Sequence, residues 1–370
     1  MSRNYQICTR CVMDTTDPEI EFDEKGVCNH CKRYDEIVRT KILTGEEREN
    51  RLKEIVDKIK REGKNKKYDC IIGVSGGVDS TYVAYTAKRL GLRPLAVHLD
   101  NGWDSEVAVS NIEKISKKLG IDLYTYVVDW EEFKDLQLAY LKASVVDIEV
   151  VTDHAIIAAL YDIADKRKIK YILSGSNIVT EGIMPDSWVH RKTDLRNLKA
   201  IHNRYGKIKL KTYPTMGLSK LLYYRFFKGI RYISLLNYMD YNKKEAKKLL
   251  ISELGWEDYG GKHYESIFTK FYQAYILPTK FNIDKRKAHL STLICSGQIT
   301  REDALKELEK PLYEKNELER DKKYVLKKLG LSEKEFENLM KLPVKKHREY
   351  GTDWSDYILK QGYIDVKRFL

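Results

Sequence analysis

The chain has 370 residues and a formal net charge of +12, and hydrophobic residues make up 42% of it. At roughly 150 residues per domain, this length predicts two or three domains. No run of about 18 uncharged apolar residues and no secretory leader is visible, so we expect a cytoplasmic protein without a transmembrane segment. The positive charge is compatible with nucleic acid, an anionic small substrate or a solvated surface, and the wide spread of the lysines favours a solvated surface.

Four of the six cysteines lie in the first 31 residues, as Cys8-Thr9-Arg10-Cys11 and Cys28-Asn29-His30-Cys31. Two Cys-x-x-Cys pairs at this separation have the spacing of a four-cysteine zinc site. Four thiolates complete a tetrahedron, which predicts a structural Zn²⁺ ion rather than a catalytic one. Reduced surface thiols or disulfides are the alternatives. His30 is a candidate replacement ligand, but we expect it to be a bystander.

Residues 41–67 are charged, and Leu52, Ile55, Val56 and Ile59 recur at helical spacing. This pattern predicts a helix that links the zinc module to the next domain.

An apolar run that begins at Ile71 ends in a Ser-Gly-Gly-Val-Asp-Ser hexapeptide, and a helix-like segment follows it. Glycines permit close approach of the backbone, and the free N–H groups at a helix start bind anions. Hydroxyl groups add donors, and a carboxylate can meet a phosphate-bound Mg²⁺. The candidate ATP-binding residues here are Ser75, Gly76, Gly77, Asp79, Ser80 and Thr81.

This hexapeptide is not a Walker loop, because it lacks the required lysine. It resembles the pyrophosphate loop (PP-loop) of the ATP-pyrophosphatase superfamily, whose members cleave ATP to AMP and pyrophosphate by adenylating a carbonyl oxygen. A tight turn without a ligand is the alternative interpretation.

From residue 69 to about residue 215, strand-like and helix-like segments alternate. Such alternation predicts a doubly wound parallel sheet with helices on both faces. Ligands of these sheets bind at the carboxyl ends of the strands. Two further strand ends therefore join the loop as candidate nucleotide contacts, namely His98, Asp100, Asn101, Gly175, Ser176 and Asn177.

Longer motifs, among them Cys-Thr-Arg-Cys-Val-Met-Asp near the N-terminus and Lys-Phe-Asn-Ile-Asp-Lys-Arg-Lys-Ala-His from residue 280, resemble the N-acetyl sugar amidotransferases over nearly the whole chain. The resemblance implies a PP-loop (adenine nucleotide α hydrolase-like) fold with a zinc ribbon-like module and a mainly helical C-terminal domain. It also implies conversion of the acetamido group of a nucleotide-activated sugar to an acetamidino group, in lipopolysaccharide or flagellin sugar biosynthesis. Ammonia would come from a separate class I glutaminase with a cyclase-like partner.

On this basis we divide the chain into a zinc module (1–40), a linking helix (41–67), an ATP-binding domain (68–217) and a helical C-terminal domain (218–370). The aromatic stretch at 218–241 is ordinary core, a docking surface for the glutaminase or a membrane-surface helix.

A dense basic cluster follows at residues 280–289, and a basic helical face is its alternative interpretation. We expect Lys285 and Arg286 to bind phosphate and Asp79 to meet the phosphate-bound Mg²⁺, with His263 and Glu265 as candidates for proton handling.

The runner-up function is a PP-loop enzyme that thiolates or amidates a tRNA base. Sulfur transfer needs a catalytic cysteine near the ATP site, and none lies between Cys70 and Cys295. We therefore expect no nucleic-acid partner. The chain also lacks the cysteine motif of a glutaminase, so ammonia must come from a partner or from solution.

Overall fold

The computed structural model describes residues 4–261 and 264–353. A five-stranded sheet lies at its centre, and neighbouring strands pair in parallel in the order β3-β2-β1-β4-β5. The strands are β1 (Cys70–Gly73), β2 (Pro94–Asp100), β3 (Asp122–Val127), β4 (Tyr171–Ser174) and β5 (Arg231–Ser234). The predicted parallel α/β sheet is therefore confirmed.

Helices cover both faces of this sheet because successive side chains of a strand point to opposite sides. Ile72 and Leu173 share one apolar cluster with helices α2, α3, α4 and α10, whereas Ile71 and Ile172 share another with α6 and α9. The helices around the sheet are α2 (Gly45–Glu62), α3 (Val78–Arg89), α4 (Glu106–Leu119), α5 (Trp130–Ala143), α6 (Val150–Lys166), α7 (Ile178–Glu181), α8 (Leu195–Tyr205), α9 (Leu218–Leu222) and α10 (Lys243–Leu254).

The fifth strand was not predicted, and it corrects the domain boundary that we placed at residue 217. Arg231 pairs with Tyr171 and Ser234 with Ser174, so residues beyond 217 complete the parallel sheet. The aromatic stretch at 218–241 is thus not one helix: it consists of α9, a π-helical turn (Tyr223–Phe227), β5 and a 3₁₀ turn (Leu235–Tyr238).

Helices dominate the remainder of the described chain, as predicted. They are α11 (Ile267–Phe271), α12 (Leu277–Phe281), α13 (Lys285–Cys295), α14 (Arg301–Glu309), α15 (Lys315–Leu329) and α16 (Glu333–Lys341). The last of them begins at a capping box, in which Ser332 and Glu335 exchange hydrogen bonds. Among the residues described, no helix is both long and apolar enough to cross a membrane.

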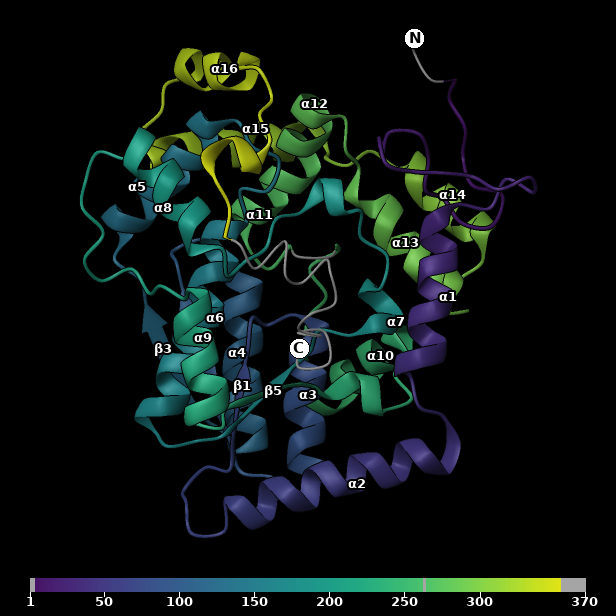
Figure 1. Cartoon of the computed structure of the whole chain (residues 1–370), viewed down its shortest axis with the longest axis vertical. Coiled ribbons are helices and arrows are strands. Elements are labelled where there is room, and N and C mark those ends of the chain that lie inside the picture. Colours follow the sequence, from purple (N-terminus) through teal and green to yellow (C-terminus); the bar gives the residue numbers. More distant parts are fainter. Residues whose placement is uncertain (1–3, 262–263, 354–370) are drawn as a thin grey trace.

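The N-terminal module packs against the C-terminal helices rather than standing apart. Its helix α1 (Asn29–Lys41) contacts α13, while α2 crosses the opposite end of the molecule (Figure 1). Arg301 donates hydrogen bonds to the carbonyls of Cys8 and Cys11, both at 3.1 Å. The Ser291 hydroxyl accepts from the N–H of Val12 at 3.2 Å. The module and α13 are therefore directly connected.

Candidate functional site

The glycine loop between β1 and α3 is held by its own hydroxyl groups. The Ser75 N–H donates to Ser80 Oγ at 3.3 Å, and the Thr81 hydroxyl donates to the Gly77 carbonyl at 2.7 Å. Gly77 is the N-cap of α3, and no side chain caps the helix there. The first N–H groups of α3 are thus available to an anion, as the sequence predicted.

Two glycines of the site are required by close backbone contacts. Gly76 has a φ of +79°, and a Cβ there would lie 2.6 Å from the carbonyl oxygen of Ala108 on α4. At Gly175, after β4, a Cβ would lie 2.7 Å from the carbonyl carbon of Asp79. The end of β4 therefore abuts the first turn of α3, and the two strand ends form one wall.

A cavity of about 360 Å³ opens at this wall, at the carboxyl ends of β1, β2 and β4. It brings together most of the predicted site residues: Ser75, Gly77, Asp79, Ser80, His98, Asn101, Gly175, Ser176, Glu265 and Lys285. The Ser75 hydroxyl donates to Glu265 Oε1 at 3.4 Å, although these residues are 190 positions apart. A residue of the C-terminal region thus contacts the glycine loop directly.

Other predicted residues support the cavity without lining it. Gly76 accepts a hydrogen bond from the Trp256 indole at 2.8 Å, and Asp100 accepts from the Gly102 N–H at 2.8 Å. Asn177 caps the short helix α7 through the Thr180 N–H. Thr81 is fully buried behind the loop. The predicted residue His263 lies outside the described residues.

Arg286 does not line the cavity, which corrects our prediction that it binds phosphate there. Its guanidinium pairs with Asp284 at 2.8 Å and donates to the carbonyls of Glu307 and Lys310 at 3.1 and 2.9 Å. These carbonyls are at the end of α14, where a cation stabilises the helix terminus. Arg286 therefore connects two helices.

Lys285, the neighbour of Arg286, does face the cavity. Its side chain is 9% exposed, and its ammonium lies 5.8 Å from the centre of the Tyr272 ring. Burial lowers the pKa of Lys285, and the nearby carboxylate of Asp147 opposes this effect. Within the described residues, this ammonium makes no hydrogen bond or ion pair. An anionic ligand would provide this buried ammonium with a partner.

Glu149, the N-cap residue of α6, is a further acidic residue of the cavity that sequence reasoning missed. It is 7% exposed, and Thr269 on α11 donates to its Oε2 at 2.9 Å. Its Oε1 has no hydrogen-bond partner among the described residues. Burial, followed by the charge of Asp153, raises the pKa of Glu149 to about 7. The group can therefore gain or lose a proton near neutral pH.

Two more charged groups of the cavity have fixed partners. Nε2 of His98 lies 3.0 Å from Asp104 Oδ2, and Nδ1 lies 3.1 Å from the Val74 carbonyl oxygen. Burial alone would lower the pKa of His98, but the hydrogen bond and negative charge of Asp104, together with the Val74 hydrogen bond, outweigh it and raise the pKa. Asp79 accepts a hydrogen bond from the Tyr241 hydroxyl.

The four N-terminal cysteines form one buried cluster, as predicted, with all four sulfur atoms within 4.8 Å of one another. The Sγ–Sγ distance is 3.9 Å for Cys8–Cys31 and 3.7 Å for both Cys11–Cys28 and Cys28–Cys31. A Zn–S bond of about 2.3 Å places the sulfurs of a tetrahedron about 3.8 Å apart. The cluster therefore fits a tetrahedral metal site.

His30 is not part of the cluster, because its Nε2 lies 2.6 Å from Asp17. Cys295, at the end of α13, places its sulfur 3.7 Å from that of Cys31. Helix α13 thus extends from the cysteine cluster, at Cys295, to the cavity at the glycine loop, at Lys285.

Two protein families match parts of the chain. Residues 265–360 match the C-terminal domain of WbpG-like LPS biosynthesis proteins, and residues 69–221 match the queuosine biosynthesis protein QueC. The second match covers strands β1 to β4 and the glycine loop but ends before β5, and the first begins at Glu265.

Two curated relatives were found. An uncharacterized protein of Methanocaldococcus jannaschii is 26% identical over 314 residues, which is 82% of this chain and 93% of that protein. A tRNA(Ile)-lysidine synthase of Chlamydia pneumoniae is 33% identical over 70 residues, or 18% of this chain and 22% of that enzyme.

Two solved structures resemble the fold at low overall similarity. An NH₃-dependent NAD synthetase from Campylobacter jejuni has a TM-score of 0.29 and 17% identity, covering 55% of this chain and 83% of that one. A predicted subunit of a tRNA methyltransferase from Methanocaldococcus jannaschii has a TM-score of 0.29 and 16% identity, covering 50% of this chain and 75% of that one.

Proposed function

We propose that the chain is an ATP-dependent amidotransferase, because its glycine loop resembles the pyrophosphate loop and its residues 265–360 match the C-terminal domain of WbpG-like lipopolysaccharide-biosynthesis proteins. It adenylates the acetamido oxygen of an N-acetyl sugar and admits ammonia, so that an acetamidino group forms with release of AMP and pyrophosphate. The observation that carries this proposal is one cavity in which the glycine loop, Lys285 and the unsatisfied Glu149 meet.

The reaction needs activation because an amide carbonyl is a poor electrophile toward ammonia. Attack of the amide oxygen on the α-phosphorus breaks the bond to pyrophosphate and gives an O-adenylyl imidate, with loss of the amide N–H proton. Ammonia then adds to the imidate carbon, the C–O bond breaks and AMP leaves with the former amide oxygen. The protein needs mainly to position these groups and to stabilise charge.

Each step has a residue of suitable chemistry in the cavity. The N–H groups at the start of α3 and the hydroxyls of Ser75 and Ser80 are placed for the pyrophosphate. Lys285 offers a buried cation to the α-phosphate. Glu149 has a free carboxylate oxygen for the proton that the amide nitrogen or the attacking ammonia loses.

The implied metal ions fit the donors present. Carboxylate oxygens are the ligands that Mg²⁺ prefers, and Asp79 and Glu265 line the cavity beside the loop. An Mg²⁺ ion there would neutralise phosphate charge. A Zn²⁺ ion in the cysteine cluster would fix α13, and with it Lys285, without taking part in the chemistry.

Ammonia is the second substrate, and its delivery by a separate class I glutaminase with a cyclase-like partner is part of this proposal. Free ammonium salt should replace the partner in a test tube, because the cavity needs only the neutral amine.

The test uses the full chain with ATP, Mg²⁺ and ammonium chloride, and nucleotide-activated diacetamido sugars as acceptors. Mass spectrometry should show a product lighter by the difference between O and NH, with AMP and pyrophosphate released in equal amounts. Release of pyrophosphate without any change in sugar mass would refute the proposal.

A tRNA-modifying enzyme is the second candidate, favoured by the matches to QueC and to a tRNA(Ile)-lysidine synthase. Thiolation is disfavoured because, among the described residues, no cysteine lines the cavity: Cys70 is buried in β1 and Cys295 lies beside the metal cluster. Pyrophosphate release that bulk tRNA stimulates, and acceptor sugars do not, would select this candidate.

A further inference from the structure

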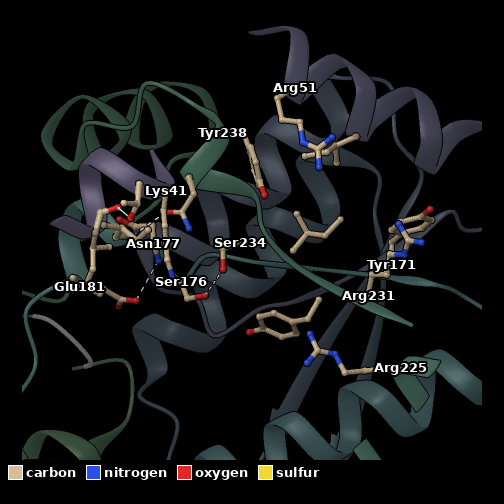
Figure 2. A pocket seen from close by; sticks show the side chains of 18 of the residues that line it. Lys41, Arg51, Tyr171, Ser176, Asn177, Glu181, Arg225, Arg231, Ser234 and Tyr238 are labelled. Carbon is tan, nitrogen blue, oxygen red and sulfur yellow. Dashed lines mark hydrogen bonds between the residues drawn. The ribbon is translucent and has the colours of Figure 1, made fainter. Parts of the chain in front are cut away.

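A second and larger cavity, of about 1640 Å³, runs along the outer edge of β5. Helices α1 and α2 form one wall, and β5 with the π-helical turn Tyr223–Phe227 forms the other. Figure 2 shows Arg51 reaching in from α2, Arg225 from the π-helical turn opposite it, and Arg231 beside Tyr171 at one end. We call this space the edge cavity.

The edge cavity adjoins the cavity of about 360 Å³ at the glycine loop, which we call the nucleotide cavity. Ser176, Glu181 and Tyr232 line both. Ser176 lies at the junction, where its hydroxyl is 3.0 Å from the hydroxyls of Ser174 and Ser234 (Figure 2). A ligand bound along β5 could therefore extend a small group past these serines toward the glycine loop.

The walls of the edge cavity are basic. Seven of its lining residues are arginine or lysine, whereas four are aspartate or glutamate. Arg33 pairs with Asp186 at 3.4 Å and Arg51 with Glu54 at 2.9 Å, which accounts for two of the acids. Within the described chain, Arg61 and Arg231 make no ion pair. Guanidinium groups bind phosphate through paired N–H donors, so this surplus favours a phosphate-bearing ligand.

Aromatic faces accompany these charges. Tyr238 and Phe226 line the cavity, and Phe226 is 69% exposed although it is strongly apolar. Phe226 lies on the π-helical turn, a rare element that is frequent at functional sites. Nucleobases stack on such exposed rings.

We propose that the edge cavity binds a nucleoside diphosphate, the leaving half of a sugar nucleotide, and that the attached N-acetyl sugar passes Ser176 into the nucleotide cavity. The arginines bind the diphosphate and the aromatic side chains stack on the base. The cavity exceeds the usual ~300–1000 Å³ of a small-ligand site, so a whole sugar nucleotide fits. The reaction on the sugar rests on the function proposed above, but the binding of a nucleoside diphosphate does not.

The test measures binding of UDP, and of GDP alongside it, by isothermal titration calorimetry to the full chain. A non-hydrolysable ATP analogue is present throughout, so that the nucleotide cavity is filled. The variant R61A/R231A removes two arginines of the edge cavity, and K334A/K341A is the control with the same change in charge, because both lysines are exposed on α16. We expect the arginine variant to bind UDP at least about tenfold more weakly, and the control to match the wild type.

The same titration with inorganic pyrophosphate and with bulk tRNA shows which kind of phosphate-bearing molecule the edge cavity binds. The proposal predicts that pyrophosphate binds more weakly than UDP, because it has no base to stack. Equal binding of UDP by the wild type and R61A/R231A would overturn it, as would arginine-dependent binding of tRNA without binding of UDP.

The two proposals fail separately. If UDP binds through the arginines but no sugar is converted to an amidine, the assignment of the edge cavity stands and the proposed function is refuted. If a sugar without a nucleotide is converted to an amidine and UDP does not bind, the proposed function stands and the assignment of the edge cavity is refuted.

Discussion

Replacing Glu149 by glutamine should make the protein more stable and less active at the same time. Glutamine keeps the shape of the side chain and removes its charge, which is buried and lacks a hydrogen bond at Oε1. The exposed Glu253 on α10 provides the matched control, E253Q. If Glu149 accepts the proton of the reaction, E149Q should lose about 100-fold or more in turnover.

The effect on stability follows from the pKa of Glu149, which burial raises from 4.5 to about 7. Between these two values the native state holds a proton that the unfolded chain has released. The resulting stability is fully present below about pH 4.5 and is lost as the pH rises through 7. From about pH 5 to pH 8, the wild type should lose about 2.5 kcal/mol of unfolding free energy relative to E149Q.

Urea unfolding at several values of pH measures this difference, with E253Q expected to follow the wild type. The rate of pyrophosphate release is measured on the same samples at each pH. In the wild type this rate should fall on the acidic side, where Glu149 is protonated and cannot accept a proton. If the unfolding free energies of E149Q and of the wild type change with pH by the same amount over this range, the reasoning about Glu149 is refuted.

The remaining predictions concern the loop, the cation and the metal. K285M should lower pyrophosphate release about 100-fold without loss of thermal stability, because the buried ammonium contributes to ligand binding rather than to folding. G175A should weaken ATP binding about tenfold or more in a titration, because its Cβ would meet the Asp79 backbone. C28S should lose the bound metal in elemental analysis and lower the melting temperature, whereas C295S should keep the metal.

Local signals explain why much of the site was predictable. The Ser-Gly-Gly-Val-Asp-Ser loop and the two Cys-x-x-Cys pairs each combine residues that are close in sequence, and the chemistry requires those residues at that spacing. The strands β1, β2 and β4 have continuous apolar runs because both faces of the sheet are covered. Their ends therefore indicated the cavity before any tertiary contact was known.

Other features depend on contacts that no local pattern encodes. The strand β5 has only four residues and begins with an exposed arginine, so its sequence is not typical of a sheet interior. Lys285 and Arg286 are adjacent on α13, and helix geometry separates their directions by about 100°. Only Lys285 can face the cavity. Glu149 stands in no motif, and it becomes a site residue only when Thr269, 120 positions away, packs against it.

The central claim is that the cavity transfers AMP to an acetamido oxygen, and one isotope measurement tests it most directly. An acceptor sugar labelled with ¹⁸O in its acetamido carbonyl is incubated with the full chain, ATP, Mg²⁺ and ammonium chloride. The mechanism predicts that the label appears in the released AMP and is absent from pyrophosphate and from the amidine product. Unlabelled AMP formed alongside an amidine, or label in the pyrophosphate, would contradict the account.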